Sequence, residues 1–185
     1  GRYMMIYDYS VQDAQGNDVP LRKYKGKVLL IVNTATKCGF TPHYKELEQM
    51  YEKYHDNGLE IIDVPCNQFG KQAPGTDAEI REFCTLNYNT KFPQMKKSDV
   101  NGANELPLYT YLKAQKGFEG FGEGKTAQTL HDYITKSNSD YQNNSDIKWN
   151  FTKFLINKKG QVVARFEPTE KISNIAKQIE ELLAL

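Results

Sequence analysis

The chain has 185 residues, with 24 Lys and Arg against 23 Asp and Glu. This length allows one domain with a substantial core, and the near balance of charge gives no reason to expect DNA or an anionic membrane as a partner. No apolar run approaches the ~18 residues that span a bilayer, and the first residues lack the pattern of a signal peptide. We therefore expect a cytoplasmic protein, in which residues 1–4 are an expression remnant or a disordered start and residues 5–185 form a single domain.

The first third of the chain predicts a hairpin followed by a strand–helix–strand unit. A weak alternation of apolar and polar residues turns at residues 15–17, which indicates an N-terminal β-hairpin. Residues 27–32 predict a continuous apolar strand of the kind that is buried on both faces of a sheet, and residues 59–64 predict a second buried strand. Between them, apolar residues at helical spacing predict an amphipathic helix, with Thr41 as its N-cap and Pro42 at its first position.

The rest of the chain predicts further helices and a second hairpin. Thr76 and Glu79 form a capping box, which opens a helix whose apolar face carries Ile80, Phe83 and Cys84. The later elements are a helix that begins at Pro107, two strands at 151–156 and 161–166 with a turn between them, and a closing amphipathic helix from Ile172.

This order of elements predicts an α/β protein with a thioredoxin-like fold. A parallel βαβ unit joined to an antiparallel hairpin gives a mixed central sheet with helices on both faces, to which the N-terminal β-hairpin is added. Residues 113–147 are an exception, because they form a polar excursion in which Ala127, Leu130 and Ile134 indicate one short helix. We expect no domain boundary and no repeat.

The three cysteines limit the chemistry that the chain can perform. The cysteines are widely spaced, at Cys38, Cys66 and Cys84. No two of them form a C-x-x-C motif, and no pair of histidines lies near them in the sequence. We therefore expect no metal site and no cofactor. In a reducing compartment these cysteines are not permanent disulfides, so redox chemistry and inert burial are the two roles that remain.

Cys38 is the best candidate for a reactive thiol. It follows the strand at 27–32 and precedes the next helix, and ligands in open α/β sheets gather beyond the carboxyl ends of the strands. The unpaired N–H groups of the helix N-terminus favour a thiolate, and Lys37 adds a nearby cation. The alternative is a small buried thiol that closes a strand, but the polar flanks of Cys38 are not typical of a core.

Three amide and indole groups are candidates for the same site. Gln72 follows the strand at 59–64, so it emerges at the same edge of the sheet as Cys38. Trp149 and Asn150 open the first strand of the last hairpin. Taken singly, these residues are more often a loop glutamine, a core tryptophan and a turn asparagine. Together they could serve a site that needs N–H donors. Cys66 directly follows a strand and is more often a buried bystander.

Four stretches of the sequence resemble the glutathione peroxidase family, in the order and at the spacings of that family, from about residue 5 to 184. They are VNTATKCGFT, VPCNQFGKQ, FCTLNYNTKFPQMKKSDVNG and KWNFTKFLI. The resemblance implies that Cys38 reduces the peroxide and that Cys38, Gln72, Trp149 and Asn150 form the active-site tetrad. It also implies the non-selenium branch, in which Cys84 is the resolving cysteine and thioredoxin, rather than glutathione, is the usual reductant.

The expected substrates are hydrogen peroxide and organic hydroperoxides, and the expected product on the protein is a Cys38–Cys84 disulfide. Because Cys84 lies within a predicted helix, we expect residues after Thr76 to unwind locally when the disulfide forms. A monomer is expected, since no exposed apolar segment stands out.

Other functions fit the sequence less well. A general thiol–disulfide oxidoreductase would carry C-x-x-C, and the threonine–cysteine pattern of a peroxiredoxin pocket is absent. A phosphate-binding loop in GFEGFGEGKT is excluded, because Glu119 stands where the motif needs glycine. A peroxide sensor that relays its disulfide to a partner protein would use the same residues, and a structural binding module would need no reactive thiol.

Overall fold

The computed structural model describes residues 4–185, so most of the expected remnant at residues 1–4 lies outside the described residues. A two-stranded antiparallel sheet holds β1 and β2, and a four-stranded mixed sheet has the order β4-β3-β5-β6. The strands are β1 (Ser10–Gln12), β2 (Asp18–Pro20), β3 (Val28–Thr34), β4 (Leu59–Pro65), β5 (Lys153–Ile156) and β6 (Val162–Phe166). The predicted N-terminal hairpin and mixed central sheet are therefore confirmed.

The parallel pair β3 and β4 places the two loops that carry the candidate residues. Both strands are rich in Val, Ile and Leu, and every one of their residues is buried. They pair in register from Val28 opposite Leu59 to Thr34 opposite Pro65. Because the strands end at the same level, the chain segments that follow them leave the sheet side by side.

The last hairpin completes the sheet, since β5 is antiparallel to both β3 and β6. The strand begins at Lys153, two residues later than the sequence predicts. Phe151 is the reason: it has a positive φ of 65°, which is not a strand conformation. Its N–H instead donates to the Asn33 carbonyl at 2.6 Å. The segment that holds Trp149 and Asn150 is thereby tied to the end of β3.

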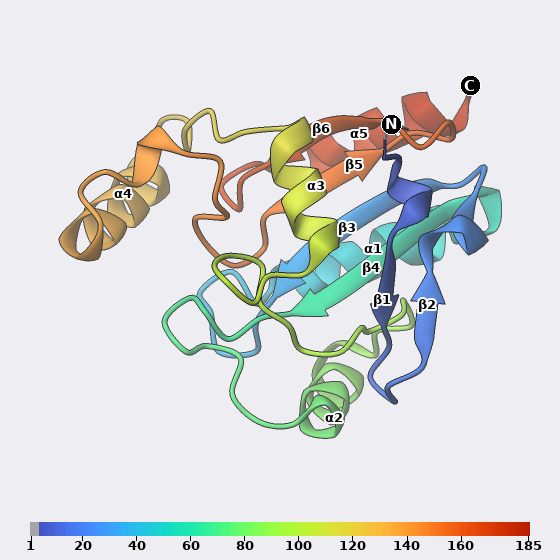
Figure 1. Ribbon diagram of the computed structural model, residues 1–185, viewed down its shortest axis with the longest axis horizontal. Helices are drawn as coiled ribbons and strands as arrows, with labels where there is room; N and C mark the ends of the chain where they lie inside the picture. Colours follow the sequence, from blue (N-terminus) through green and yellow to red (C-terminus); the bar gives the residue numbers. More distant parts are fainter. Residues whose placement is uncertain (1–3) are drawn as a thin grey trace.

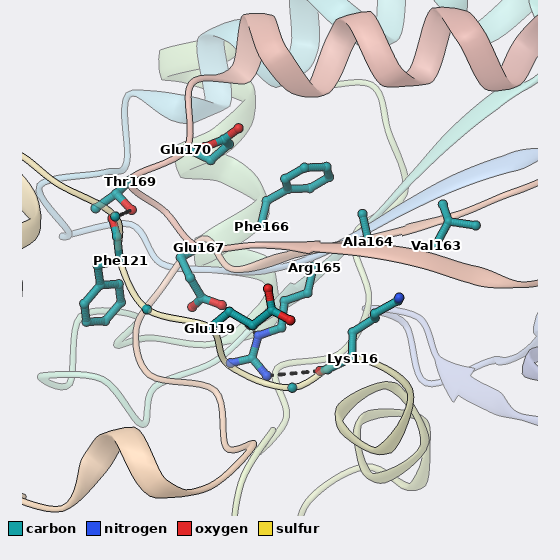
Figure 2. A pocket seen from close by; sticks show the side chains of 13 residues that line it. Lys116, Glu119, Phe121, Val163, Ala164, Arg165, Phe166, Glu167, Thr169 and Glu170 are labelled. Atoms are coloured by element: carbon teal, nitrogen blue, oxygen red, sulfur yellow. Dashed lines mark hydrogen bonds and ion pairs between the residues drawn. The ribbon is translucent and has the colours of Figure 1, made fainter.

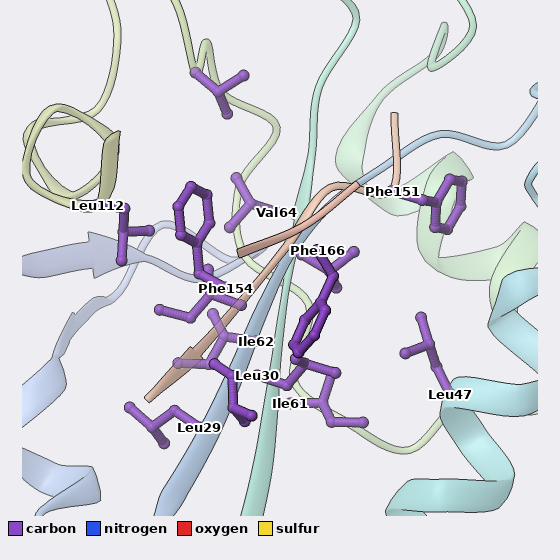
Figure 3. Close-up of a cluster of buried hydrophobic side chains, with 14 of the residues drawn as sticks. Leu29, Leu30, Leu47, Ile61, Ile62, Val64, Leu112, Phe151, Phe154 and Phe166 are labelled. Carbon is purple, nitrogen blue, oxygen red and sulfur yellow. The ribbon is translucent and has the colours of Figure 1, made fainter. Parts of the chain in front are cut away.

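Helices cover both faces of the central sheet (Figure 1). Helices α1 and α5 lie on one face and α3 crosses the other. Figure 3 shows Leu112 of α3 beside Phe154, while Leu47 of α1 lies on the opposite side of the strands with Phe151. The helices are α1 (His43–Tyr54), α2 (Asp77–Tyr88), α3 (Pro107–Gln115), α4 (Lys125–Ser137) and α5 (Ile172–Leu183), with short 3₁₀ turns at Ile6–Asp8, Leu21–Tyr24, His55–Asn57 and Tyr141–Asn143.

Two helix beginnings test the sequence analysis in opposite ways. In α2 the capping box is present: Glu79 N–H donates to Thr76 Oγ1 at 3.1 Å, and Thr76 N–H donates to Glu79 Oε1 at 3.2 Å. In α1 the predicted cap is wrong, because the helix begins at His43 after a non-capping Pro42. The Thr41 hydroxyl is used elsewhere, within the loop that holds Cys38.

The polar excursion at 113–147 is more ordered than its composition suggests. The predicted short helix is present as α4, which buries Ala127, Leu130 and Ile134. This helix projects from the end of the molecule opposite the N-terminal hairpin (Figure 1). Within residues 4–185, no helix has both the length and the apolar character that crossing a membrane requires.

Candidate active site

A tight loop after β3 presents Cys38. The Thr41 hydroxyl accepts the Cys38 N–H at 2.9 Å and donates to the Ala35 carbonyl at 2.9 Å, so it closes the loop from inside. The Cys38 sulfur in turn accepts the N–H of Phe40 at 3.3 Å. Only 8% of Cys38 is exposed. The sulfur therefore lies just below the surface, in a backbone environment that offers it a donor.

The Cys38 loop is bonded directly to the segment that follows β4. The backbone N–H groups of Thr36 and Lys37 both donate to the Gln72 carbonyl, at 3.0 and 2.9 Å. Gln72 thus sits against the residues that precede Cys38. This contact follows from the in-register ends of the parallel strands.

Asn150 orients the side chain of Gln72. The Asn150 Nδ2 group donates to the Phe69 carbonyl at 3.4 Å and to Gln72 Oε1 at 3.0 Å. Because a carbonyl can only accept, the amide nitrogen of Asn150 must face Phe69, and Gln72 must present its oxygen to that nitrogen. The Gln72 Nε2 group then points away, and it has no hydrogen-bond partner among residues 4–185. It is a donor available to a substrate.

Trp149 lies next to this amide pair, and 9% of it is exposed. Its ring contacts Phe69 and the α4 residue Tyr133, with centroids 6.0 and 5.2 Å apart. Its carbonyl accepts from Asn33 Nδ2 at 3.2 Å, which holds the segment to β3. The indole N–H makes no hydrogen bond within the described part of the chain. Trp149 thus adds a second available donor.

A buried lysine belongs to the same region, and the sequence analysis missed it. Lys153 in β5 has no exposed surface, and its Nζ lies 2.7 Å from Nδ1 of His43, the first residue of α1. Burial lowers the pKa of Lys153 to about 7. Burial, together with the Lys153 charge, lowers the pKa of His43 to about 3. The histidine is therefore a neutral acceptor for the ammonium group. Cys38 is close enough to Lys153 to be among the groups that act on the pKa of this lysine.

The other two cysteines are fully buried, and no disulfide joins any of the three. Burial raises the pKa of the Cys66 thiol to about 11. Burial, and then the nearby Asp63 carboxylate, raise the pKa of the Cys84 thiol to about 12. Cys84 lies on the inner face of α2 with Ile80, as the helical spacing predicts. Both thiols are protonated at neutral pH, and neither is in contact with solvent.

A large surface hollow lies away from these residues. It lies between the loop at 116–122 and β6 (Figure 2). Its volume is about 490 Å³. Its Arg165 is already bonded to Glu167 and to the carbonyls of Lys116, Ser145 and Asp146. The candidate residues do not line it.

Smaller hollows adjoin the candidate residues on two sides. One of about 290 Å³ lies between Thr36–Lys37 and the α2 residues Ile80 and Phe83. Another of about 290 Å³ is lined by Trp149, Gly70 and Tyr133. The structure thus combines a nearly buried thiol, free N–H donors and openings to solvent. A thiol in this setting can attack a small electrophile, and the N–H donors can stabilise the anion that leaves.

Comparisons with known proteins agree with this chemistry. The family model described as glutathione peroxidase matches residues 6–113. The chain is 48% identical over 180 residues to a glutathione peroxidase-like peroxiredoxin 2 of Saccharomyces cerevisiae, covering 97% of each chain. The crystal structure of T. cruzi GPX1 matches with a TM-score of 0.71 at 32% identity, covering 98% of this chain and 97% of that one. A thiol:disulfide interchange protein of the thioredoxin family from Chlorobium tepidum, 12% identical with a TM-score of 0.60 and coverage of 99% and 98%, shares the fold alone.

Proposed function

This chain belongs to the glutathione peroxidase family, and on that premise we propose that it reduces hydrogen peroxide and organic hydroperoxides with Cys38 as the nucleophile. It is a peroxidase of thioredoxin-like fold. The Cys38 thiolate attacks one peroxide oxygen, the O–O bond breaks, and the sulfur becomes a sulfenic acid. The other oxygen leaves as hydroxide or alkoxide and is protonated to water or an alcohol.

The departing oxygen is where this site can lower the barrier most. Lowering a thiol's pKa increases the thiolate but also weakens it as a nucleophile, so ionisation alone gains little. A donor aimed at a developing oxyanion contributes ~10²–10³ in rate. We assign Gln72 Nε2 and the Trp149 indole N–H to that task. Asn150 positions Gln72, because its own amide hydrogens are directed to protein acceptors.

The Asn150–Gln72 hydrogen bond is the observation that carries this proposal. It joins residues 78 positions apart in the sequence. The same Gln72 accepts both N–H groups that precede Cys38. A glutamine in an ordinary surface loop would need neither contact. The arrangement therefore supports a donor that is held in place beside the thiol.

The second half of the cycle uses Cys84. Its sulfur attacks the sulfenic sulfur of Cys38, water leaves, and a Cys38–Cys84 disulfide forms. A dithiol reductant then exchanges with that disulfide and returns both thiols. We propose thioredoxin in this role, with glutathione less suited. A second thiol in the chain supports a dithiol partner, as does the peroxiredoxin-like relative. Cys84 is buried in α2, and we propose that this helix opens for the bond to form.

The proposal is tested by the consumption of hydrogen peroxide and of an organic hydroperoxide, each with thioredoxin or glutathione as the sole reductant. We expect many turnovers with thioredoxin and far fewer with glutathione. A peroxide sensor would instead stop after a few turnovers. Cys38→Ser should be inactive with either reductant, because an alcohol supplies no nucleophile at neutral pH. Appreciable turnover by this variant would remove Cys38 from its assigned role.

We also propose that the protein is a monomer. Among residues 4–185, the exposed large apolar side chains are scattered: Leu86, Tyr133 and Val163 lie on α2, α4 and β6, while Met4, Met5 and Leu185 lie near the two ends of the chain. Scattered residues of this kind do not make an interface. Light scattering of the purified protein at several concentrations tests this point, and a concentration-independent dimer mass would refute it.

A further inference from the structure

A buried carboxyl group lies outside the set of residues described so far. Asp63 in β4 is 2% exposed. Its Oδ1 accepts a hydrogen bond from Thr34 Oγ1 in the neighbouring strand, and its Oδ2 accepts one from the Tyr44 hydroxyl of α1 at 3.3 Å. A carboxyl in the interior of a sheet is costly unless it is bonded or protonated. The bonds to Thr34 and Tyr44 offset part of that cost and hold the carboxyl against α1.

Cys84 is the neighbour of Asp63 that suggests a function for this carboxyl group. The Tyr44 hydroxyl bonds Asp63, and the side chains of Tyr44 and Cys84 lie close enough for each to act on the pKa of the other. The titratable and charged groups that face Asp63 are Tyr44 from α1, Cys84 and Arg81 from α2, and Tyr109 from α3.

The charge state of this cluster is set by burial. Burial raises the pKa of Asp63 to about 7, well above that of an ordinary carboxyl. The carboxyl is thus close to half ionised at neutral pH. Burial, with the Asp63 carboxylate added, raises the pKa of Cys84 to about 12. The two groups disfavour being ionised together, as neighbouring acids in a low dielectric do.

This arrangement meets a difficulty in the resolving step. A thiolate is the form that attacks a sulfenic acid, and a thiol with a pKa of about 12 hardly ionises at neutral pH. Loss of the Cys84 proton to solvent while Asp63 is ionised would place two negative charges in the interior. Transfer of that proton to the Asp63 carboxylate leaves the net charge of the cluster unchanged, so it avoids that penalty.

We propose that Asp63, acting through the Tyr44 hydroxyl, accepts the proton of Cys84 when Cys84 forms its disulfide with Cys38. This inference rests on the proposed function, since it needs Cys84 to be the resolving cysteine. In this role Asp63 accepts a proton from Cys84 through Tyr44, and it does not touch the peroxide. Its proton is later released to solvent.

The step balances in atoms and electrons. The S–H bond of Cys84 breaks, its proton passes to the Tyr44 oxygen, and the Tyr44 proton passes to Asp63 Oδ2. The electron pair left on the Cys84 sulfur forms the S–S bond, while the S–O bond of the Cys38 sulfenic acid breaks. The hydroxide that leaves takes a proton from solvent and becomes water. Cys84 is oxidised, and the sulfenic sulfur of Cys38 is reduced.

Proton transfer from Cys84 then promotes the opening of α2. The relay exists only while Cys84 packs against Tyr44, so the proton leaves before or as the helix opens. A thiolate in an apolar pocket is less stable than a thiol there. Its formation therefore favours the movement that carries Cys84 out of the core.

The test measures the rate of disulfide formation in the full-length protein after one equivalent of hydrogen peroxide, followed by acid quench and alkylation of free thiols from about pH 6 to about pH 9. In the unsubstituted protein the rate should rise with pH and level off above about pH 7, where Asp63 is ionised. Asp63→Asn should be slower by about 100-fold near neutral pH, the lower end of what a general base contributes. Its rate should rise by about tenfold per pH unit, because the proton must go to hydroxide.

Two tyrosine variants separate the relay from packing. Tyr44→Phe removes the hydroxyl through which the proposed relay passes, so it should follow the pH profile of Asp63→Asn. Tyr109→Phe is the matched control: Tyr109 is fully buried near Asp63, and its hydroxyl has no partner among residues 4–185. It should follow the unsubstituted protein. If Asp63→Asn does not fold, Tyr44→Phe decides alone.

The possible failures can be told apart. The peroxide consumed in the first turnover should be the same in all four proteins. A levelling profile in Asp63→Asn or in Tyr44→Phe would overturn the inference and leave the proposed function standing. Absence of a Cys38–Cys84 disulfide in the unsubstituted protein would overturn both.

Discussion

The role of an amide side chain depends on which of its two ends is occupied. In the pair formed by Asn150 and Gln72, the Phe69 carbonyl fixes Asn150, and Asn150 fixes Gln72. The free donor therefore belongs to Gln72, although the two residues look equivalent in the sequence. Reasoning from residue types groups both as N–H donors, but only the structure separates the donor from the residue that orients it.

This dependence predicts a strong coupling between the two side chains. Gln72→Ala should slow the reduction of peroxide by ~10²–10³, the usual loss for one oxyanion donor. Asn150→Ala should slow it nearly as much, because an unanchored Gln72 no longer aims its amide. The double variant should then be little slower than Gln72→Ala alone. Stopped-flow rates of the first turnover test this, and losses that multiply would show that Asn150 acts independently.

Lys153 shows what residue-level reasoning overlooks. Lysine is rarely buried, so the KWNFTKF stretch suggested only its tryptophan and asparagine as site residues. The usable signal was the strand itself, since each residue of β5 is buried. A lysine in such a strand has to enter the interior, and the structure shows it bonded to His43.

At the scale of elements, helix α2 has a well-capped N-terminus but packs few side chains against the rest of the protein. Its capping box stabilises the first turn, yet Ile80 and Cys84 are its only fully buried residues. Leu86 is 76% exposed, and the helix ends at Tyr88, followed by the C-cap residue Asn89 with a positive φ of 51°. A helix with few buried side chains opens at a lower free-energy cost than strands such as β3 and β4.

Oxidation should therefore loosen α2 and little else. We expect faster amide hydrogen exchange across residues 77–92 after treatment with peroxide, because the proposed disulfide takes Cys84 out of its buried position. Exchange in β3 and β4 should be unchanged. Cys84→Ser, which cannot form the disulfide, is the control and should show no difference. Equal exchange across α2 in the reduced and oxidised protein would contradict local opening.

The elements that sequence reasoning placed well are those with a strong local signal. The capping box at Thr76 and the apolar run of β3 each specify one structure. Thr41 is the contrary case: its type and its neighbour Pro42 both favour a helix cap, but its hydroxyl bonds Cys38 and Ala35 instead. A tertiary contact within the functional loop outweighs the local preference there.

For the whole molecule, the site is a consequence of topology. Segments that begin near residues 35, 66 and 149 meet because β3 and β4 end together and because Asn33 ties the last segment to β3. The sequence predicts the meeting of the first two segments, since parallel strands share an edge. The cluster of Asp63, Tyr44 and Cys84 was not predicted, because its members come from three elements whose packing no local pattern specifies.

The buried Lys153 should leave a trace in the pH dependence of global stability. Its pKa is about 7 in the folded protein, against 10.5 for an ordinary lysine. Between these values the unfolded chain binds more protons, so stability rises with pH. Relative to Lys153→Met, the unsubstituted protein should gain stability from about pH 7 to about pH 8.5, by at most about 1.4 kcal/mol per pH unit. Urea unfolding at several pH values measures this, and a constant difference would show that Lys153 keeps an ordinary pKa.

The central claim is that Cys38 meets the peroxide and that Cys84, not Cys66, resolves it. Peptide mapping by mass spectrometry after one equivalent of hydrogen peroxide tests it most directly, with Cys66→Ser and Cys84→Ser treated alongside the unsubstituted protein. The account predicts a Cys38–Cys84 disulfide in the unsubstituted protein and in Cys66→Ser. In Cys84→Ser it predicts a sulfenic acid on Cys38 with no disulfide. A Cys38–Cys66 disulfide in the unsubstituted protein, or a disulfide that lacks Cys38, would contradict the account.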